Sequence, residues 1–427
     1  MLMNKKKEIF PPLRFGGYKS KWIIDSFDFE FLQTNSFSRA EMDDEKGNVK
    51  NIHYGDILTK YNDTLRDISV VPFVNKNIDL SKFREESYLK NGDIVIADTA
   101  EDFTAGKAVE VLNVDFPVLA GQHTFLCRPK IKFAPGFMGY YLNSPSYHNR
   151  LIPLLTGTKV YSISKANIKS TFVLYPENYE EQQKIADCLS SIDELIDAES
   201  RKLKVLEKYK KGLMQKLFPA EGKTLPEWRF PEFQGCEEWK YEEIGEIGKV
   251  ITGKTPSTPD AALWDGNIQF VTPTDITENK YQHHTQRTVV KTPKMKVLPK
   301  HTIMFTCIAS IGKMALSLYP CITNQQINSI VPKSCYNSEF VYYSLLQKTF
   351  LIKAGFANST LPIINKTDFS KIQVPVILDK KEQQRISDCL SEIDIMITGQ
   401  SNKVEQLKAH KKGLMQGLFP SLEEADV

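Results

Sequence analysis

One octapeptide in the second half of the chain has the spacing of a phosphate-binding loop. Residues 248–255, GKVITGKT, match the pattern G-x-x-x-x-G-K-[ST], in which backbone amides and a lysine hold nucleotide phosphates. That chemistry needs a helix directly after the loop, because the helix N-terminus faces the phosphate. Pro256 and Pro259 follow at once, so we expect no such helix. The sequence predicts an exposed loop in which Lys254 and Thr255 can contact phosphates or bases.

Other catalytic patterns are weaker still. Pro259-Asp260 followed by Glu278-Asn279-Lys280 loosely matches a metal-dependent nuclease, but residues 277–280 read as a polar turn. The seven cysteines include no C-x-x-C pair, so neither a zinc ribbon nor a disulfide framework is indicated. Five histidines lack a second metal ligand at a suitable spacing: His53, His123, His283, His284 and His301. We therefore predict no catalytic residue and no metal site.

The strongest signal in the chain is an internal repeat. Residues 181–219 return as residues 382–420 without a gap, and 23 of the 39 positions are identical. A period of about half the chain indicates a duplicated two-part unit and not a solenoid. Each copy ends at Phe-Pro, where a helix must stop, and each begins with a capping signature, Asn178-x-x-Glu181 and Asp379-x-x-Glu382.

Both copies carry an apolar seam with coiled-coil spacing. Steps of four and three residues connect its positions, and the two polar exceptions fall at equivalent places, Glu199 and Lys210 in the first copy, Gln400 and Lys411 in the second. Two long helices that pair antiparallel would bury both seams. Two separate core helices in two domains are the alternative. The full seams are Ile185, Leu189, Ile192, Ile196, Glu199, Leu203, Leu206, Lys210, Leu213 and Leu217, and Ile386, Leu390, Ile393, Ile397, Gln400, Val404, Leu407, Lys411, Leu414 and Leu418.

A glycine interrupts each predicted helix within the shared segment KKGLMQ. A helix-interior glycine costs about 1 kcal/mol relative to alanine, so Gly212 and Gly413 indicate close approach of another backbone or a helix break. We expect these segments to form a docking surface for a partner, and a simple bend is the alternative. The residues assigned to this surface are Lys211, Gly212, Met214, Gln215, Lys412, Gly413, Met415 and Gln416.

The repetition extends weakly into the sequence before each helix. Residues 91–97 and 300–306 both read as short buried strands, 121–129 parallels 324–332, and the helix-like stretches 137–144 and 340–347 correspond. The intervening residues 24–90 and 250–298 differ and are rich in polar side chains. A shared frame with variable polar loops suits two readers of base edges on a split target. A duplicated protein-interaction adaptor without DNA binding is the alternative.

Bulk properties agree with a soluble protein of two or three domains. The chain has 427 residues, of which 41% are apolar, and a formal net charge of +3, which permits nucleic-acid binding without arguing for it. No apolar run reaches the ~18 residues of a membrane span, and we expect a reducing, cytoplasmic location.

These residues resemble the specificity subunits of type I restriction–modification systems. The resemblance rests on EQQKIADCLSSID and KKGLMQKLFP with their second copies, on the openings LRF…W and WRFPEF…W, and on the GKTPST loop at 253–258. It implies an α+β fold with two pseudo-symmetric α/β target-recognition domains, separated by an antiparallel coiled coil of two long helices. The implied divisions are the first recognition domain at 1–177, the first helix at 178–219, the second domain at 220–378, the second helix at 379–420 and a tail at 421–427.

The resemblance also implies partners and cofactors. The chain would bind double-stranded DNA, dock two methyltransferase subunits and join ATP-dependent restriction subunits. S-adenosylmethionine, ATP and Mg²⁺ would belong to those partners and not to this chain.

The candidate DNA contacts are polar or basic groups in predicted loops. For the first domain they are Ser36, Arg39, Tyr54, Thr99, Thr104, Lys159 and Tyr161. For the second they are Lys254, Thr255, Ser257, Thr258, Thr274, Gln282, His283, Arg287 and Lys313.

Overall fold

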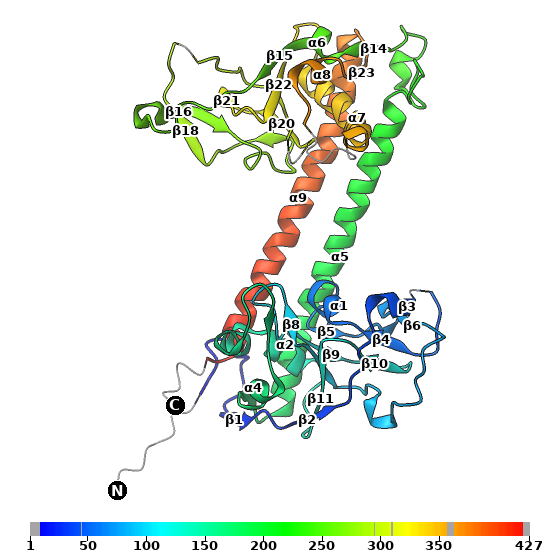
Figure 1. Ribbon diagram of the computed structural model, residues 1–427, viewed down its shortest axis with the longest axis vertical. Helices are drawn as coiled ribbons and strands as arrows, with labels where there is room; N and C mark the ends of the chain where they lie inside the picture. Colours follow the sequence, from blue (N-terminus) through cyan, green and yellow to red (C-terminus); the bar gives the residue numbers. More distant parts are fainter. Residues whose placement is uncertain (1–8, 44, 294, 309–310, 357–362, 422–427) are drawn as a thin grey trace. The chain divides into compact units, whose positions relative to one another are not determined.

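The chain folds into two compact units that are discontinuous in sequence. The structure is a computed structural model that describes residues 9–43, 45–293, 295–308, 311–356 and 363–421. The first unit contains residues 1–199 and 403–427, and the second contains residues 200–402. Each long helix, α5 (Tyr179–Leu217) and α9 (Lys380–Leu418), therefore begins in one unit and ends in the other (Figure 1).

The first unit is built around a five-stranded sheet of order β2-β11-β7-β9-β5 and a four-stranded sheet of order β10-β4-β6-β3. The pairs β1-β13 and β8-β12 complete it. Its strands are β1 (Trp22–Ser26), β2 (Phe29–Leu32), β3 (Met42–Asp43), β4 (Lys50–Ile52), β5 (Thr64–Leu65), β6 (Phe73–Val74), β7 (Ile94–Ala97), β8 (Thr99–Ala100), β9 (Ala108–Val111), β10 (Val118–Ala120), β11 (Thr124–Pro129), β12 (Tyr161–Ser162) and β13 (Phe172–Pro176). Its short helices are α1 (Tyr54–Thr59), α2 (Phe137–Asn143), α3 (Pro145–Leu151) and α4 (Lys165–Lys169).

The second unit repeats this plan with a five-stranded sheet, β15-β22-β19-β20-β17, a three-stranded sheet, β18-β16-β21, and the pair β14-β23. Its strands are β14 (Lys240–Glu243), β15 (Gly248–Thr252), β16 (Trp264–Val271), β17 (Tyr281–Gln282), β18 (Arg287–Val289), β19 (Ile303–Thr306), β20 (Met314–Ser317), β21 (Cys321–Thr323), β22 (Ile327–Pro332) and β23 (Gln373–Val376). Its helices besides the long ones are α6 (Ile244–Ile247), α7 (Ser338–Phe356) and α8 (Lys366–Ser370).

The two five-stranded sheets have the same strand order and the same strand directions. In each, the first four strands pair antiparallel and the last pairs parallel, β5 with β9 and β17 with β20. The predicted buried strands are β7 and β19, in which every residue is buried. The other predicted equivalences, β11 with β22 and α2 with α7, are confirmed by the same topology.

The seam of each long helix is buried, as predicted. All twenty predicted seam positions are buried or half-buried. In the first unit, the core that contains Ile185 and Leu189 of α5 also contains Leu418 of α9. In the second unit, Leu217 of α5 shares a core with Ile386 of α9. The helix halves in each unit therefore run antiparallel, and the alternative of two separate core helices is wrong.

The polar seam positions pair across the helices. Lys411 Nζ lies 2.6 Å from Asp193 Oδ1 in the first unit, and Lys210 Nζ lies 2.6 Å from Asp394 Oδ1 in the second. Lys403 in turn pairs with Glu199. A lysine of each long helix thus forms an ion pair with an aspartate of the other helix. These ion pairs explain why the apolar seam tolerates a charge at the two lysine positions.

The predicted capping boxes are only half formed. The amide of Glu181 donates to Asn178 Oδ1 at 3.0 Å, and that of Glu382 donates to Asp379 Oδ1 at 3.3 Å. The two glutamate side chains do not cap; they accept two hydrogen bonds each from Arg14 and Arg229, at 2.7–2.8 Å. The Arg-Phe openings of the two units are therefore anchored to the first turns of the long helices by buried ion pairs.

The glycines of the KKGLMQ segments interrupt neither helix. α5 runs unbroken through Gly212 and α9 through Gly413, and a Cβ atom at either position would meet nothing within 4 Å. The expectation of a helix break is therefore wrong. No backbone of the described chain approaches either glycine, so close approach by the backbone of a partner stays a prediction. Open space lies above both glycines.

Glu110 makes the stability of the first unit depend on pH. Burial raises the pKa of this carboxyl to about 7, although the amides of Gly136 and Gly139 donate to it. This pKa lies above the unfolded value of 4.5, so the folded state retains the proton to a higher pH than the unfolded state. The free energy of unfolding should therefore fall as the pH rises from about 4.5 to 7. The loss should be on the order of 3 kcal/mol.

Hydrogen exchange of the first unit between pH 5 and pH 8, corrected for intrinsic rates, measures this loss. Glu110→Gln should remove most of the slope, and the raised pKa of Asp98 should leave a smaller one. The second unit is an internal control, because Leu316 pairs with Ile303 where Glu110 pairs with Ile94. Equal slopes in both units would contradict the assignment to Glu110.

Candidate nucleic-acid interface

Contacts join most of the candidate residues of the first unit into one neighbourhood. Arg39 pairs with Asp56 of α1 at 2.7 Å, and Tyr54 begins the same helix. The Tyr54 ring lies 5.3 Å from that of His123, whose Nδ1 is 3.3 Å from Asp98 Oδ1. Burial raises the pKa of Asp98, although His123 opposes the shift.

The same neighbourhood continues through the pair β8-β12. Thr99 Oγ1 donates to the carbonyl oxygen of Tyr161 at 3.0 Å, and the Tyr161 ring lies 4.8 Å from that of Phe103. Thr104 follows directly and donates to Asp102 Oδ1. The remaining candidates, Ser36 and Lys159, are exposed in the loops that precede Arg39 and Tyr161. This surface combines hydroxyls, aromatic rings and cations, the groups that contact bases and phosphates.

In the second unit the candidates gather around the loop that follows β15. Thr255 Oγ1 donates to Gln325 Oε1 at 2.7 Å, and the carbonyl of Ser257 accepts from the Trp264 indole at 3.1 Å. The Arg287 guanidinium lies over the same indole, 3.5 Å from the ring centroid. Lys254 and Thr258 are exposed in this loop, Thr274 and His283 are exposed in neighbouring loops, and Lys313 is exposed between β19 and β20.

Six candidates lie in secondary structure and not in the loops predicted for them. Two of these are buried: Thr99 is 9% exposed and Gln282 is 3% exposed. Gln282 Nε2 donates to the carbonyl of His284, so this side chain supports the loop from within. The six are Arg39 in a 3-10 helix, Tyr54 in α1, Thr99 in β8, Tyr161 in β12, Gln282 in β17 and Arg287 in β18.

The phosphate-loop pattern does not form a phosphate loop. β15 ends at Thr252, and the next helical residues are the 3-10 turn Ala261–Leu263. The amides of Gly253 and Lys254 already donate to the carbonyls of Ile327 and Thr323. Because those amides are occupied, the loop cannot cradle a phosphate, as the two prolines predicted.

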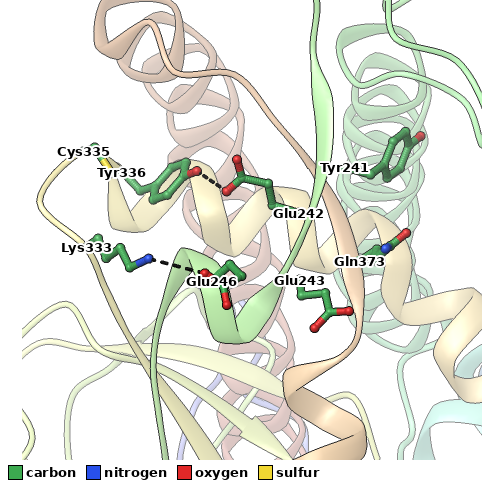
Figure 2. Close-up of a pocket in the computed structure, with 8 residues that line it drawn as sticks. All are labelled: Tyr241, Glu242, Glu243, Glu246, Lys333, Cys335, Tyr336 and Gln373. Carbon is green, nitrogen blue, oxygen red and sulfur yellow. Dashed lines mark hydrogen bonds and ion pairs between the residues drawn. The ribbon is translucent and has the colours of Figure 1, made fainter.

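A pocket of about 460 Å³ lies beside β14 and α6 in the second unit. Figure 2 shows its acidic lining, with Glu242, Glu243 and Glu246 around it. Tyr336 donates to Glu242 Oε2 at 2.5 Å, and burial together with this bond raises the pKa of the tyrosine. The carboxylates disfavour a phosphate backbone, so this pocket is not part of the proposed DNA surface.

The expected partner surface on the long helices is smaller than predicted. Met214 and Met415 are each 7% exposed and belong to the cores of the two units, so they cannot dock a partner. The exposed members are Lys211, Gln215, Lys412, Gly413 and Gln416, with Gly212 half-buried. No group of three or more potential metal ligands occurs among the residues that the structure describes.

Comparison with known proteins identifies the family to which the chain belongs. The sequence model described as "Type I restriction modification DNA specificity domain" matches residues 29–208 and again residues 236–409. The chain belongs to this family of DNA specificity proteins. The double match corresponds to the repeat seen in the sequence and to the two units of the structure.

Individual relatives carry matching names. The MjaX specificity subunit of Methanocaldococcus jannaschii, described as a putative type I restriction enzyme subunit, is 26% identical over 84% of each chain. The MjaIX specificity subunit of the same organism is 30% identical over a segment that covers 44% of this chain and 45% of that protein. A crystal structure of the S subunit from M. genitalium superposes with a TM-score of 0.60 at 18% identity, covering 97% of this chain and all of that one.

Family membership confirms the predicted specificity-subunit fold and the prediction that this specificity chain is a DNA-recognition subunit and not an enzyme in itself. Among the residues described, no helix is long and apolar enough to cross a membrane. The candidate DNA contacts stay predictions at the level of single residues.

Substitution of Arg287 tests whether this residue contacts DNA. Arg287→Ala should relax one base position by about 1–3 kcal/mol if the guanidinium reads a base edge, or weaken binding to all sequences if it meets phosphate. Arg287→Lys is the matched control, because it keeps the charge but loses the planar contact with Trp264. Quantitative DNA binding against single-base target variants measures both. Unchanged affinity and base preference for Arg287→Ala would reject the assignment.

Proposed function

We propose that this chain reads a bipartite DNA target, one half-site with each unit, and carries no catalysis of its own. The observation that supports this most is the contrast between frame and loops. The two units share one sheet topology and one pair of arginine–glutamate anchors. The loops that carry the candidate contacts differ between them, as expected of two readers with different base preferences.

Continuity of the long helices supports the bipartite form. Both α5 and α9 cross from one unit to the other, so the two readers are joined by regular helix and not by flexible linkers. A target read in this way has two fixed half-sites and a gap of set length. Basic candidates such as Lys254 and Lys313 supply the phosphate contacts, which should make binding salt-dependent.

The proposed partners are two methyltransferase subunits and ATP-dependent restriction subunits. S-adenosylmethionine, ATP and Mg²⁺ would bind to those subunits, and this chain would hold no cofactor. The methyltransferase subunits would dock on the exposed KKGLMQ faces, where each copy offers a lysine, a glycine and a glutamine. Two equivalent faces on one chain suit two copies of one partner.

Blocking the open space above the glycines tests this docking. Gly212→Leu and Gly413→Leu should each weaken association with one methyltransferase subunit about tenfold or more, because a bulky side chain would stand where the partner packs. Leucine favours a helix more than glycine does, so the fold should not suffer. Gly399→Leu is the control, since that glycine of α9 is also exposed and open but lies outside the segment. Native mass spectrometry counts the bound subunits; equal stoichiometry in all three variants would contradict the proposal.

Genome-wide mapping of methylated adenines, in cells with and without this chain, tests the function itself. We expect one split motif, two half-sites and a constant gap, to lose methylation when the chain is absent. An unchanged map, or a loss spread over unrelated sequences, would reject sequence reading by this chain and favour the adaptor.

A further inference from the structure

The second unit contains a pocket whose lining differs from the matching sequence positions of the first unit. The pocket has a volume of about 690 Å³ and lies between the loop 253–257 and residues 292–293 and 295–298. It belongs to a single compact unit and borders the candidate contacts Lys254, Thr255 and Ser257. A volume of this size is typical of a site for a small organic ligand.

Backbone hydrogen bonds establish which residues correspond in the first unit. The amide of Asn35 donates to Ala120 O at 2.9 Å, and the amide of Lys254 donates to Thr323 O at 2.8 Å, so these bonds are equivalent. Counted two residues onward from Asn35 and from Lys254, Phe37 corresponds to Pro256.

A second pair of bonds fixes the other side of the pocket. The amides of Leu89 and Leu298 donate to the equivalent carbonyls of Val118 and Cys321, at 2.9 and 2.8 Å. Counted back six residues in the sequence from these leucines, Phe83 stands at the position of Thr292.

Both phenylalanines are part of a core cluster of the first unit. Phe37 and Phe83 are buried, with ring centroids 5.8 Å apart, in one core cluster. Their counterparts Pro256 and Thr292 both line the pocket of the second unit. At these two sequence positions the second unit thus has pocket-lining residues where the first has two aromatic rings.

The lining of the pocket has two chemical characters. Ile251, Leu263, Met295 and Ile322 supply apolar walls, and the side chains of Lys254 and Lys296 add two cations. Thr323 is 2% exposed, lines the pocket, and its Oγ1 is buried without a hydrogen-bond partner among the described residues. Apolar walls with two cations at the edge fit a flat heteroaromatic ring that carries an anionic group.

We propose that this pocket binds a single nucleotide, with its base between the apolar walls and its phosphate near Lys254 and Lys296. The nucleotide could come from two sources: a free mononucleotide, or a nucleotide rotated out of the bound DNA, as in proteins that extrude a base. The second source rests on the proposed function. The first does not.

Fluorescence titration of the full-length chain with 2-aminopurine deoxyribonucleoside 5′-monophosphate tests the free source. We expect saturable binding that natural deoxynucleoside monophosphates compete away. The double variant Pro256→Phe/Thr292→Phe, which copies the first unit, should weaken binding at least about tenfold. Lys254→Ala/Lys296→Ala should weaken it and reduce its salt dependence without touching the core. Lys249→Ala, an exposed lysine outside the pocket, is the control.

Duplexes that carry 2-aminopurine at each position of the mapped target test the DNA source in the assembled complex. An increase in emission at one position, absent in the phenylalanine double variant, identifies an extruded nucleotide. Binding of the free probe alone identifies the free source. If neither signal appears while the complex still selects its target, the pocket proposal is overturned and the proposed function stands. Loss of target selection in the wild type would overturn the proposed function, and the free titration would still decide the pocket.

Discussion

Replacing Phe419 with alanine should cost the first unit about 3–5 kcal/mol, although this residue lies near the end of the chain. Phe419 is 1% exposed, and its ring lies 5.6 Å from that of Tyr141, 5.8 Å from that of Phe137 and 6.4 Å from that of Trp22. Chain ends usually tolerate such changes because they pack against little. Here the end of α9 completes the core of the N-terminal unit, so its loss leaves a cavity.

The internal repeat supplies the matched control. Phe218 occupies the equivalent place in the second unit, where its ring lies 5.5 Å from that of Trp239 and 5.8 Å from that of Phe340. Hydrogen exchange separates the two effects: Phe419→Ala should loosen α2, whereas Phe218→Ala should loosen α7. A Phe419→Ala protein with unchanged exchange in α2 would show that the C-terminal segment does not belong to the first core.

Replacing Lys411 with alanine should cost about 3–5 kcal/mol, because it strands two carboxylates. Lys411 Nζ lies 2.5 Å from Asp63 Oδ2 and 2.6 Å from Asp193 Oδ1. The lysine side chain is 15% exposed and both aspartates are 12% exposed. Burial alone would lower the pKa of Lys411, but the two carboxylates outweigh it and hold the pKa above its ordinary value. Without the lysine, the negatively charged carboxylates of Asp63 and Asp193 would lie close together at a site that little water reaches.

Three comparisons make this result specific. Lys412→Ala, at the exposed neighbouring position, should change stability by less than about 0.5 kcal/mol. Lys210→Ala, which strands only Asp394, should cost less than Lys411→Ala. Lys411→Met combined with Asp63→Asn and Asp193→Asn should recover most of the loss, since the stranded charges are then gone. Denaturant unfolding measures all four proteins, and equal stability of the Lys411 and Lys412 variants would refute the argument.

The helices and the shared frame were predictable because their signals are local and repeated. A seam of apolar residues at 3.5-residue spacing specifies a paired helix wherever it occurs. Its second copy has polar exceptions at the same places, and this match is enough to indicate that the two helices pair with each other. The role of Glu181 differs from the predicted one for a physical reason. Its spacing from Asn178 suits a capping box, but Arg14, far away in sequence, offers a stronger charge-assisted partner.

The candidate site was harder to predict because exposure depends on the fold. Gln282 and Thr99 look like loop residues, yet both are buried in two-residue strands whose pairing partners lie far along the chain. Trp264 was missed for the same reason: its contact with Arg287 spans a strand pair that no local pattern reveals. The pocket beside Pro256 could not be predicted because residues far apart in the sequence, such as Ile251, Met295 and Ile322, line it together.

The division of the chain has a consequence for its synthesis. The second unit is a single uninterrupted stretch, residues 200–402, and can fold as soon as the ribosome has released it. The first unit begins earlier but also contains the later residues 403–421. Until residues 418 and 419 have been synthesised, Ile185, Leu189 and Trp22 therefore lack the apolar partners that Leu418 and Phe419 provide. A nascent chain that has not yet released this segment would expose these apolar side chains to chaperones and proteases.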